Sequence, residues 1–118
     1  MSVSPTYRAF VLEQLARATT GVRARAMFGG VGIYGSDLFF ALIDDDTVYF
    51  KVDDTNRPQF EALGMGPFRP AGPGGEAMQY YALPEGLLED PEALRPWIDD
   101  ALAVARRTRG RRSRRGGA

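Results

Sequence analysis

The segment MFGGVGIYGSDLFFALIDDDTVYFKV, residues 27–52, contains three short apolar runs separated by turn residues. Residues 31–34 are followed by Gly35-Ser36-Asp37, and residues 38–43 are followed by three Asp residues. Both polar clusters are typical of tight turns between antiparallel strands. Residues 48–52 form the third run, so the segment predicts an antiparallel β-meander.

The segments on either side predict three helices and two further strands. Ser4-Pro5 and Asp90-Pro91 are helix starts, because Ser or Asp caps free N–H groups and Pro suits the first helical position. A short third helix is expected from residue 53 to residue 63. Residues 22–28 predict an edge strand, and residues 78–83 predict a fifth strand. This order predicts a single α+β domain, an antiparallel β-meander plus a further strand, with helices packed on one face.

The middle strand of the meander is apolar on both faces if its side chains alternate regularly. Such a strand is either covered on both sides or has one face that meets a partner. We therefore predict a partner-binding face on the sheet. Its expected members are apolar, aromatic or cationic: Leu38, Phe40, Tyr49, Lys51 and Tyr80. The competing interpretation is an ordinary half-buried sheet, in which aromatic residues are also preferred.

The composition excludes several kinds of chemistry. The 118-residue chain has no Cys and no His, so it lacks disulfides, thiolate nucleophiles and any His general base. A zinc site of the usual kind is not expected either. Asp44-Asp45-Asp46 is interpreted as a solvated turn, since its spacing is not that of a calcium-binding loop. We expect no enzymatic activity, no cofactor and no metal.

Two smaller motifs have structural and functional interpretations. Gly29-Gly30-Val31-Gly32 resembles a phosphate cradle in composition, but it leads into a strand and not into a helix N-terminus. A bend with close backbone approach is the favoured interpretation. Arg23 and Arg25 alternate along the expected edge strand, where they either protect the edge by charge or contact an anion or partner.

The net charge of zero conceals an asymmetry. Residues 1–105 contain eight Lys and Arg against fifteen Asp and Glu, a charge of −7, and residues 106–118 contribute +7. We predict a folded domain over 1–105 and a disordered Arg-rich tail over 106–118. The tail either contacts nucleic acid without sequence specificity or pairs with the chain's own acidic surface. Its cationic residues are Arg106, Arg107, Arg109, Arg111, Arg112, Arg114 and Arg115.

The meander and the segment before it resemble the N-terminal domain of the TfoX (Sxy) family, over roughly residues 5–106. The motif residues that carry the resemblance are Met27, Phe28, Gly29, Gly30, Gly32 and Tyr34. The family is named for bacterial regulators of DNA competence. The resemblance implies the same class of fold and a role in transcription, alongside the cyclic-AMP receptor protein. Many members carry a second domain, whereas this chain is expected to be a stand-alone N-terminal domain.

The resemblance and the residues together favour a non-enzymatic regulatory or adaptor domain that acts through an unidentified protein partner. Two alternatives remain open. One is a protein tethered to DNA or RNA by its Arg-rich tail, and the other is a small-ligand-binding domain with a pocket under the Gly-rich loop of residues 64–75. No signal sequence or membrane-spanning run is apparent, which predicts a cytoplasmic protein. The sequence does not indicate an oligomeric state.

Overall fold

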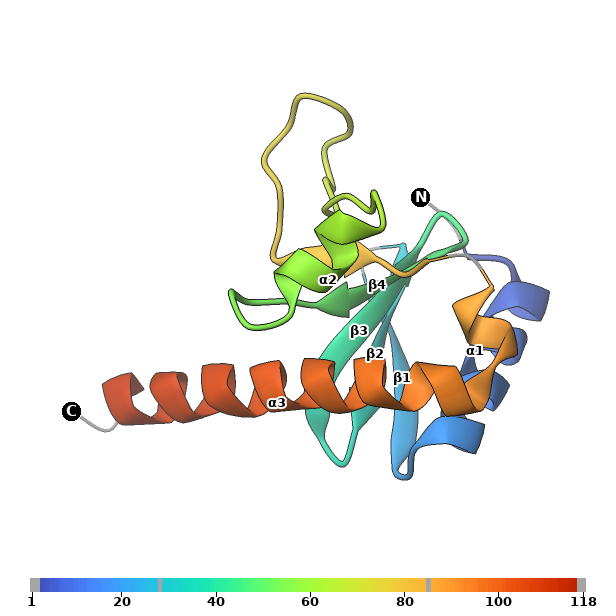
Figure 1. The fold of residues 1–118 in the computed structure, drawn as a ribbon, viewed down its shortest axis with the longest axis horizontal. Helices are drawn as coiled ribbons and strands as arrows, with labels where there is room; N and C mark the ends of the chain where they lie inside the picture. The colour runs from blue at the N-terminus through green and yellow to red at the C-terminus, as the bar shows by residue number, and fades with distance from the viewer. Residues whose placement is uncertain (1–2, 28, 85, 117–118) are drawn as a thin grey trace.

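The computed structural model of the protein describes residues 3–27, 29–84 and 86–116, with side chains as far as Gly110. Five strands form one antiparallel sheet in the order β1-β2-β3-β4-β5, and Figure 1 shows the long C-terminal helix crossing it. The elements are α1 (Pro5–Ala18), β1 (Val22–Met27), β2 (Gly30–Gly35), β3 (Leu38–Asp44), β4 (Thr47–Lys51), α2 (Arg57–Ala62), β5 (Tyr80–Ala82), a 3-10 turn (Leu87–Glu89) and α3 (Pro91–Gly116). The predicted α+β fold and the meander are confirmed.

The two hairpin turns follow from short polar residues that tolerate a left-handed backbone. Ser36 and Asp37 have φ of 48° and 68°, and Asp45 and Asp46 have φ of 50° and 54°. Two successive positive φ values are the signature of a two-residue turn whose twist matches that of the flanking strands. These turns join β2 to β3 and β3 to β4.

The three helices begin close to where the sequence predicts. Ser4 accepts a hydrogen bond from the backbone N–H of Tyr7, and Asp90 accepts one from Ala93. The short helix α2 begins later than predicted, at Arg57. The reason is that the Asp53 carboxylate accepts hydrogen bonds from Thr55 and does not cap the helix. The fifth strand is also shorter than predicted, at Tyr80–Ala82.

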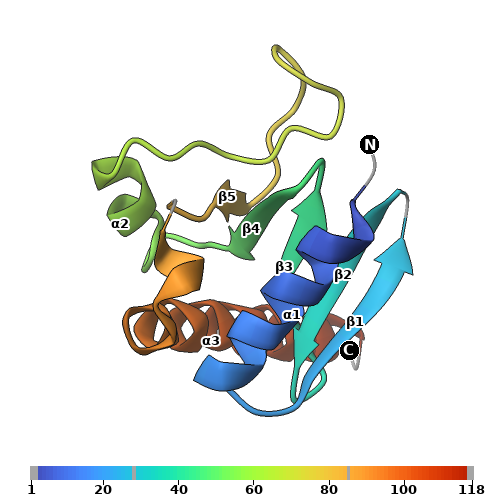
Figure 2. The ribbon, with the colours of Figure 1, turned by 90° about the vertical axis from the view of Figure 1, so that its right-hand side faces the viewer.

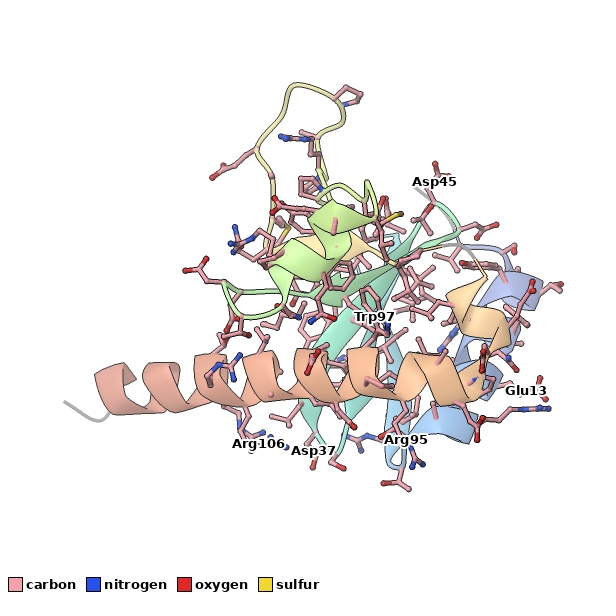
Figure 3. The ribbon with its side chains drawn as sticks, viewed as in Figure 1. Glu13, Asp37, Asp45, Arg95, Trp97 and Arg106 are labelled. Atoms are coloured by element: carbon pink, nitrogen blue, oxygen red, sulfur yellow. The ribbon has the colours of Figure 1, made fainter. Side chains whose placement is uncertain are left out.

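The core lies between the helices and one face of the sheet. The inward-facing side chains of α1 and α3 pack against the large residues of β2, β3 and β4. Trp97 of α3 packs edge-on against Phe60 of α2, with ring centroids 4.9 Å apart. Figure 3 shows Trp97 on the side of α3 that faces α2. The fully buried residues include Val11, Leu15, Ile33, Phe40, Ile43, Phe50, Phe60, Leu94 and Ile98. Within the described residues, no helix is long and apolar enough to cross a membrane.

A β-bulge in β3 corrects the predicted partner face. Ile33 of β2 pairs with Ala41, but Tyr34 pairs with Phe39, so Phe40 is an extra residue in β3. A bulge turns two successive side chains toward the same face. Leu38 and Phe40 are therefore 6% and 0% exposed in the core, and the prediction that they lie on the partner face is wrong.

Helix α3 corrects the predicted tail. The helix was expected to end at Arg106-Arg107, with disorder beyond, but it continues to Gly116. Arg is a good helix former, and cations near a helix C-terminus interact favourably with the helix dipole. The Thr108 hydroxyl also donates to the carbonyl of Val104. The segment therefore has both the local propensity and the contacts to prolong the helix.

Candidate functional site

A row of aromatic side chains crosses the sheet face opposite the helices. The Tyr34 and Phe39 rings stack with centroids 5.1 Å apart, and the Tyr80 ring lies 5.8 Å from Phe39. Lys51 Nζ lies 5.7 Å from the Phe39 centroid and 5.2 Å from the Tyr80 centroid, and it donates to the Tyr80 hydroxyl at 3.2 Å. Mutual packing holds these four side chains in place, so the row is an ordered aromatic cluster with one cation.

The connection between α2 and β5 covers part of this face. Its Phe68 ring lies 4.8 Å from the ring of Tyr49 on β4. The backbone of Phe68 donates to Tyr80 and accepts from Met78, so the connection runs out and back along the edge of β5. Figure 2 shows this loop projecting beyond the sheet, away from α3. The second apolar face of the middle strand is thus partly covered by the chain itself.

An apolar groove of about 440 Å³ lies under this loop. Its floor comes from β1, β2 and β3, and its wall comes from the loop and β5. The side chains that define it are Met27, Phe39, Leu42, Phe68, Met78 and Tyr80. Met78 is 43% exposed at the side of this groove. We call this depression the apolar groove.

A second depression, which we call the polar cleft, begins where the groove ends. It has a volume of about 1080 Å³ and shares Phe39, Met78 and Tyr80 with the apolar groove. It extends past β4 to the C-terminal half of α3. Its charged lining residues are of both signs: Asp37, Lys51, Asp53, Asp54, Arg57, Arg107 and Arg109. The two depressions form one continuous surface that is apolar at one end and charged at the other.

Ion pairs order the charged end. Arg57 contacts Asp54 at 2.6 Å, and Arg107 of α3 contacts Asp53 at 2.9 Å. Arg107 also donates to the hydroxyl of Thr55. Burial raises the pKa of Asp53, but hydrogen bonds from Thr55 and Arg107 outweigh this effect, so the pKa lies below its usual value of 3.8. Asp53 therefore ties α3 to the segment between β4 and α2.

Replacing Asp53 by Asn is expected to lower the free energy of unfolding by about 1–2 kcal/mol at pH 7, because charge-assisted hydrogen bonds are lost. Since the folded-state pKa is lowered, the wild-type advantage is full above the usual value of 3.8 and is lost as pH falls below it. Urea denaturation of both proteins at pH 7 and about pH 2.5 measures this difference. The neighbouring change Asp54→Asn is the control. Its side chain is 97% exposed, so a cost below about 0.5 kcal/mol is expected. An equal difference in unfolding free energy between the wild type and Asp53→Asn at both pH values would show that the ionised Asp53 carboxylate is not the source of the stability.

The family-motif residues have structural positions around the start of β2. Gly29 has a φ of 80° in the turn from β1. A Cβ on Gly30 would lie 2.6 Å from the carbonyl oxygen of Ile43, and one on Gly32 would meet the end of the Met27 side chain. Tyr34 belongs to the aromatic row. Phe28 lies outside the described residues. The close approaches agree with the bend interpretation of the glycines and not with a phosphate cradle.

The other predicted candidates do not line either depression, except for Asp44 of the Asp turn, which lines the apolar groove. Arg23 pairs with Asp37 at 2.7 Å on the outer edge of the sheet, and Arg25 is exposed beside it. Asp45 and Asp46 form the β3–β4 turn. Among the described residues, no group of three or more His, Cys, Asp or Glu is arranged to hold a metal ion.

Sequence reasoning placed three of the five partner-face residues correctly on the open side of the sheet. Lys51 and Tyr80 meet in the aromatic row, and Tyr49 lies nearby against Phe68. It missed Phe39 because the bulge reverses the alternation, and it did not name Leu42, although regular alternation places Leu42 on the same face as Leu38 and Phe40. It also missed Phe68 and Met78, whose place beside the sheet depends on how the loop folds back. The adjacent pair Phe39-Phe40 was the available signal, since one of two neighbouring Phe residues had to face away from the core.

The fold and this surface define a small α+β domain with helices on one face of its sheet and a row of aromatic side chains on the other. The family model of the TfoX N-terminal domain matches residues 13–105, most of the chain. The chain therefore belongs to the TfoX N-terminal domain family. No curated protein is similar enough to the chain to match it.

Proposed function

We propose that the protein is a non-enzymatic regulatory or adaptor domain that binds a protein segment along the apolar groove and the polar cleft. The observation that supports this most directly is the continuity of the two depressions through Phe39, Met78 and Tyr80. An extended segment with apolar residues followed by charged residues would match this surface along its length. Aromatic and Met side chains are also enriched at protein interfaces.

We propose no catalytic role, because the chain lacks the side chains that most enzymes use for acid–base or nucleophilic chemistry. The chain has no His or Cys, the side chains that most often act as bases or nucleophiles near neutral pH. The carboxylates of Asp53 and Asp54 in the polar cleft are each bound to an Arg guanidinium. A carboxylate whose pKa is lowered, as that of Asp53 is, is a poor general acid at neutral pH.

The process in which the domain acts is proposed from its family. Since the family is named for competence regulators, we propose a partner in the transcription machinery or among its regulators. A small apolar ligand is the second candidate function, because a groove of about 440 Å³ falls in the size range of small-molecule sites. The continuation of the groove into a charged cleft favours the protein segment.

A photo-cross-linking amino acid at position 78 tests the proposal in cells. Met78 borders both depressions and is 43% exposed, so replacement leaves the core intact. Phe10 on α1, which is 37% exposed on another side of the molecule, is the matched control position. We expect a protein adduct from position 78 that position 10 does not give. Adducts at neither position, with a small molecule retained on the purified protein, would favour the second candidate.

The captured partner is then tested with purified proteins. Leu42→Arg places a charge in the apolar groove, and it is expected to weaken binding about 30-fold, as for a hot-spot residue. Leu63→Arg, at a residue 56% exposed on the end of α2, is the control and should bind as the wild type does. Equal affinity of the two variants would place the contact elsewhere. A partner with no connection to transcription would overturn the proposed process and leave the binding surface standing.

A further inference from the structure

The C-terminal part of α3 concentrates positive charge on one helical segment. Seven of the ten residues at positions 106–115 are Arg, and none is acidic. The rest of the chain, residues 1–105, carries a formal charge of −7. Since the backbone is helical to Gly116, this charge is held on a rod and is not spread along a flexible chain.

The body of the protein holds the base of this segment. Arg107 pairs with Asp53 and donates to Thr55, and Arg109 donates to the carbonyl oxygen of Asp37 at 3.3 Å. Seven residues of α3 follow Arg109, a length of about 10 Å at the usual helical rise. Figure 1 shows the last turns of α3 extending past the sheet. The segment is therefore fixed at its base and extends away from the domain.

Few ion pairs join the described side chains of this segment, which end at Gly110, to the acidic body. Among the side chains that the structure describes, Arg107 is the only residue of the segment in an ion pair with the body. Besides Arg107 and Arg109, which serve as anchors, the segment contains five further Arg residues in its sequence: Arg106, Arg111, Arg112, Arg114 and Arg115. Such a charge density calls for an equally dense partner from outside the molecule.

We propose that the C-terminal segment of α3 is a binding site for the phosphate backbone of duplex DNA, independent of base sequence. B-form DNA carries about one negative charge per 1.7 Å of its axis, and its major groove admits an α-helix. Arg guanidinium groups pair with phosphate in a bidentate manner, and phosphate contacts carry no sequence information. A second copy of the chain would offer only dispersed carboxylates and is the weaker match. The inference does not depend on the proposed protein partner, because the polar cleft reaches only the base of this segment, at Arg107 and Arg109.

Fluorescence anisotropy with the full chain and a labelled duplex of about 20 base pairs tests this site across a salt series. With five phosphate contacts the affinity should fall about 500-fold between 50 and 200 mM salt, from a slope of about 0.9 per contact. The variant R111Q/R112Q/R115Q should retain a fall of only about 12-fold. The matched control is R17Q/R23Q/R25Q, which removes the same charge from the body and should keep the wild-type slope.

Gly110 tests whether the helix itself is needed. It lies within the helical segment, and a Cβ there would meet nothing within 4 Å. Gly110→Ala should bind DNA as tightly as the wild type or more tightly, because Ala favours the helix by about 1 kcal/mol over Gly. Gly110→Pro should break the helix, so that the Arg residues after it no longer have a fixed arrangement. DNA binding should then weaken about tenfold, because ordering these residues on DNA costs free energy. Equal affinity of both variants would overturn the role of the helix.

Several outcomes would overturn the DNA site. One is no binding of duplex DNA at 50 mM salt, and another is a wild-type slope in R111Q/R112Q/R115Q. Duplex RNA of the same sequence and polyglutamate are measured in parallel. Tighter binding of either one would assign the segment to RNA or to an acidic protein. Sedimentation that shows tail-dependent self-association without DNA binding would assign it to a second copy of this chain.

Discussion

Phe40→Ala is expected to lower the free energy of unfolding by about 3–5 kcal/mol, whereas Phe39→Ala, one residue earlier, should cost about 1–2 kcal/mol. Phe40 is fully buried and meets Phe50 edge-on with centroids 5.6 Å apart. Phe39 is half-buried in the aromatic row, where truncation leaves a partly solvated gap and no closed cavity. Urea denaturation of the two variants measures the difference.

The comparison tests the bulge directly. If β3 alternated regularly, Ala41 and Ile43 in the core would require Phe39 to be buried and Phe40 to be exposed. The order of the two costs would then be reversed. Phe39→Leu and Phe40→Leu provide milder versions of the same pair in case Phe40→Ala does not fold. A larger cost at position 39 than at position 40 would show that the bulge is absent.

Gly30→Ala is the second large expected effect, a loss of about 2–3 kcal/mol, as for overpacking of a rigid site. The added Cβ would lie 2.6 Å from the carbonyl oxygen of Ile43, which belongs to the backbone of β3 and can move only with the strand. Gly32→Ala should cost less, because its Cβ meets the mobile end of Met27 at 2.5 Å. Thermal or urea denaturation gives both values.

Gly66→Ala is the matched control for these substitutions. A Cβ at Gly66 would meet nothing within 4 Å, and its backbone has no positive φ, so we expect a change within about 0.5 kcal/mol. Combining Gly32→Ala with a shortened residue at Met27 should recover most of the Gly32 cost. If Gly30→Ala were as stable as Gly66→Ala, β2 and β3 would not be held as close together at Gly30 and Ile43 as the structure shows.

Much of the fold is predictable because its signals are local. A helix cap, such as Ser4 or Asp90, acts on backbone groups within three residues of itself. A turn such as Asp45-Asp46 needs only two residues that accept a positive φ. The order of the strands follows, since consecutive antiparallel strands joined by tight turns become neighbours. The class of fold and the family could therefore be inferred from the sequence.

The candidate site was predictable only in part. Tyr49, Lys51 and Tyr80 were placed on one face by simple alternation along β4 and β5, where no bulge intervenes. Phe39 was assigned to the wrong face, because the bulge that turns it to the open side follows from packing between β3 and the helices. The length of α3 was also mistaken, since an Arg-rich composition is compatible with both disorder and a helix.

The sequence by itself determined the turns, the caps, the order of the elements and the charge asymmetry between residues 1–105 and residues 106–118, because each depends on neighbouring residues or on composition. The tertiary structure alone decided which Phe enters the core, how the loop after α2 folds back over the sheet, and where Arg107 meets Asp53. These features join residues separated by up to 54 positions in the chain. Their geometry is set by the balance of burial and hydrogen bonding over the whole domain, which no local segment contains.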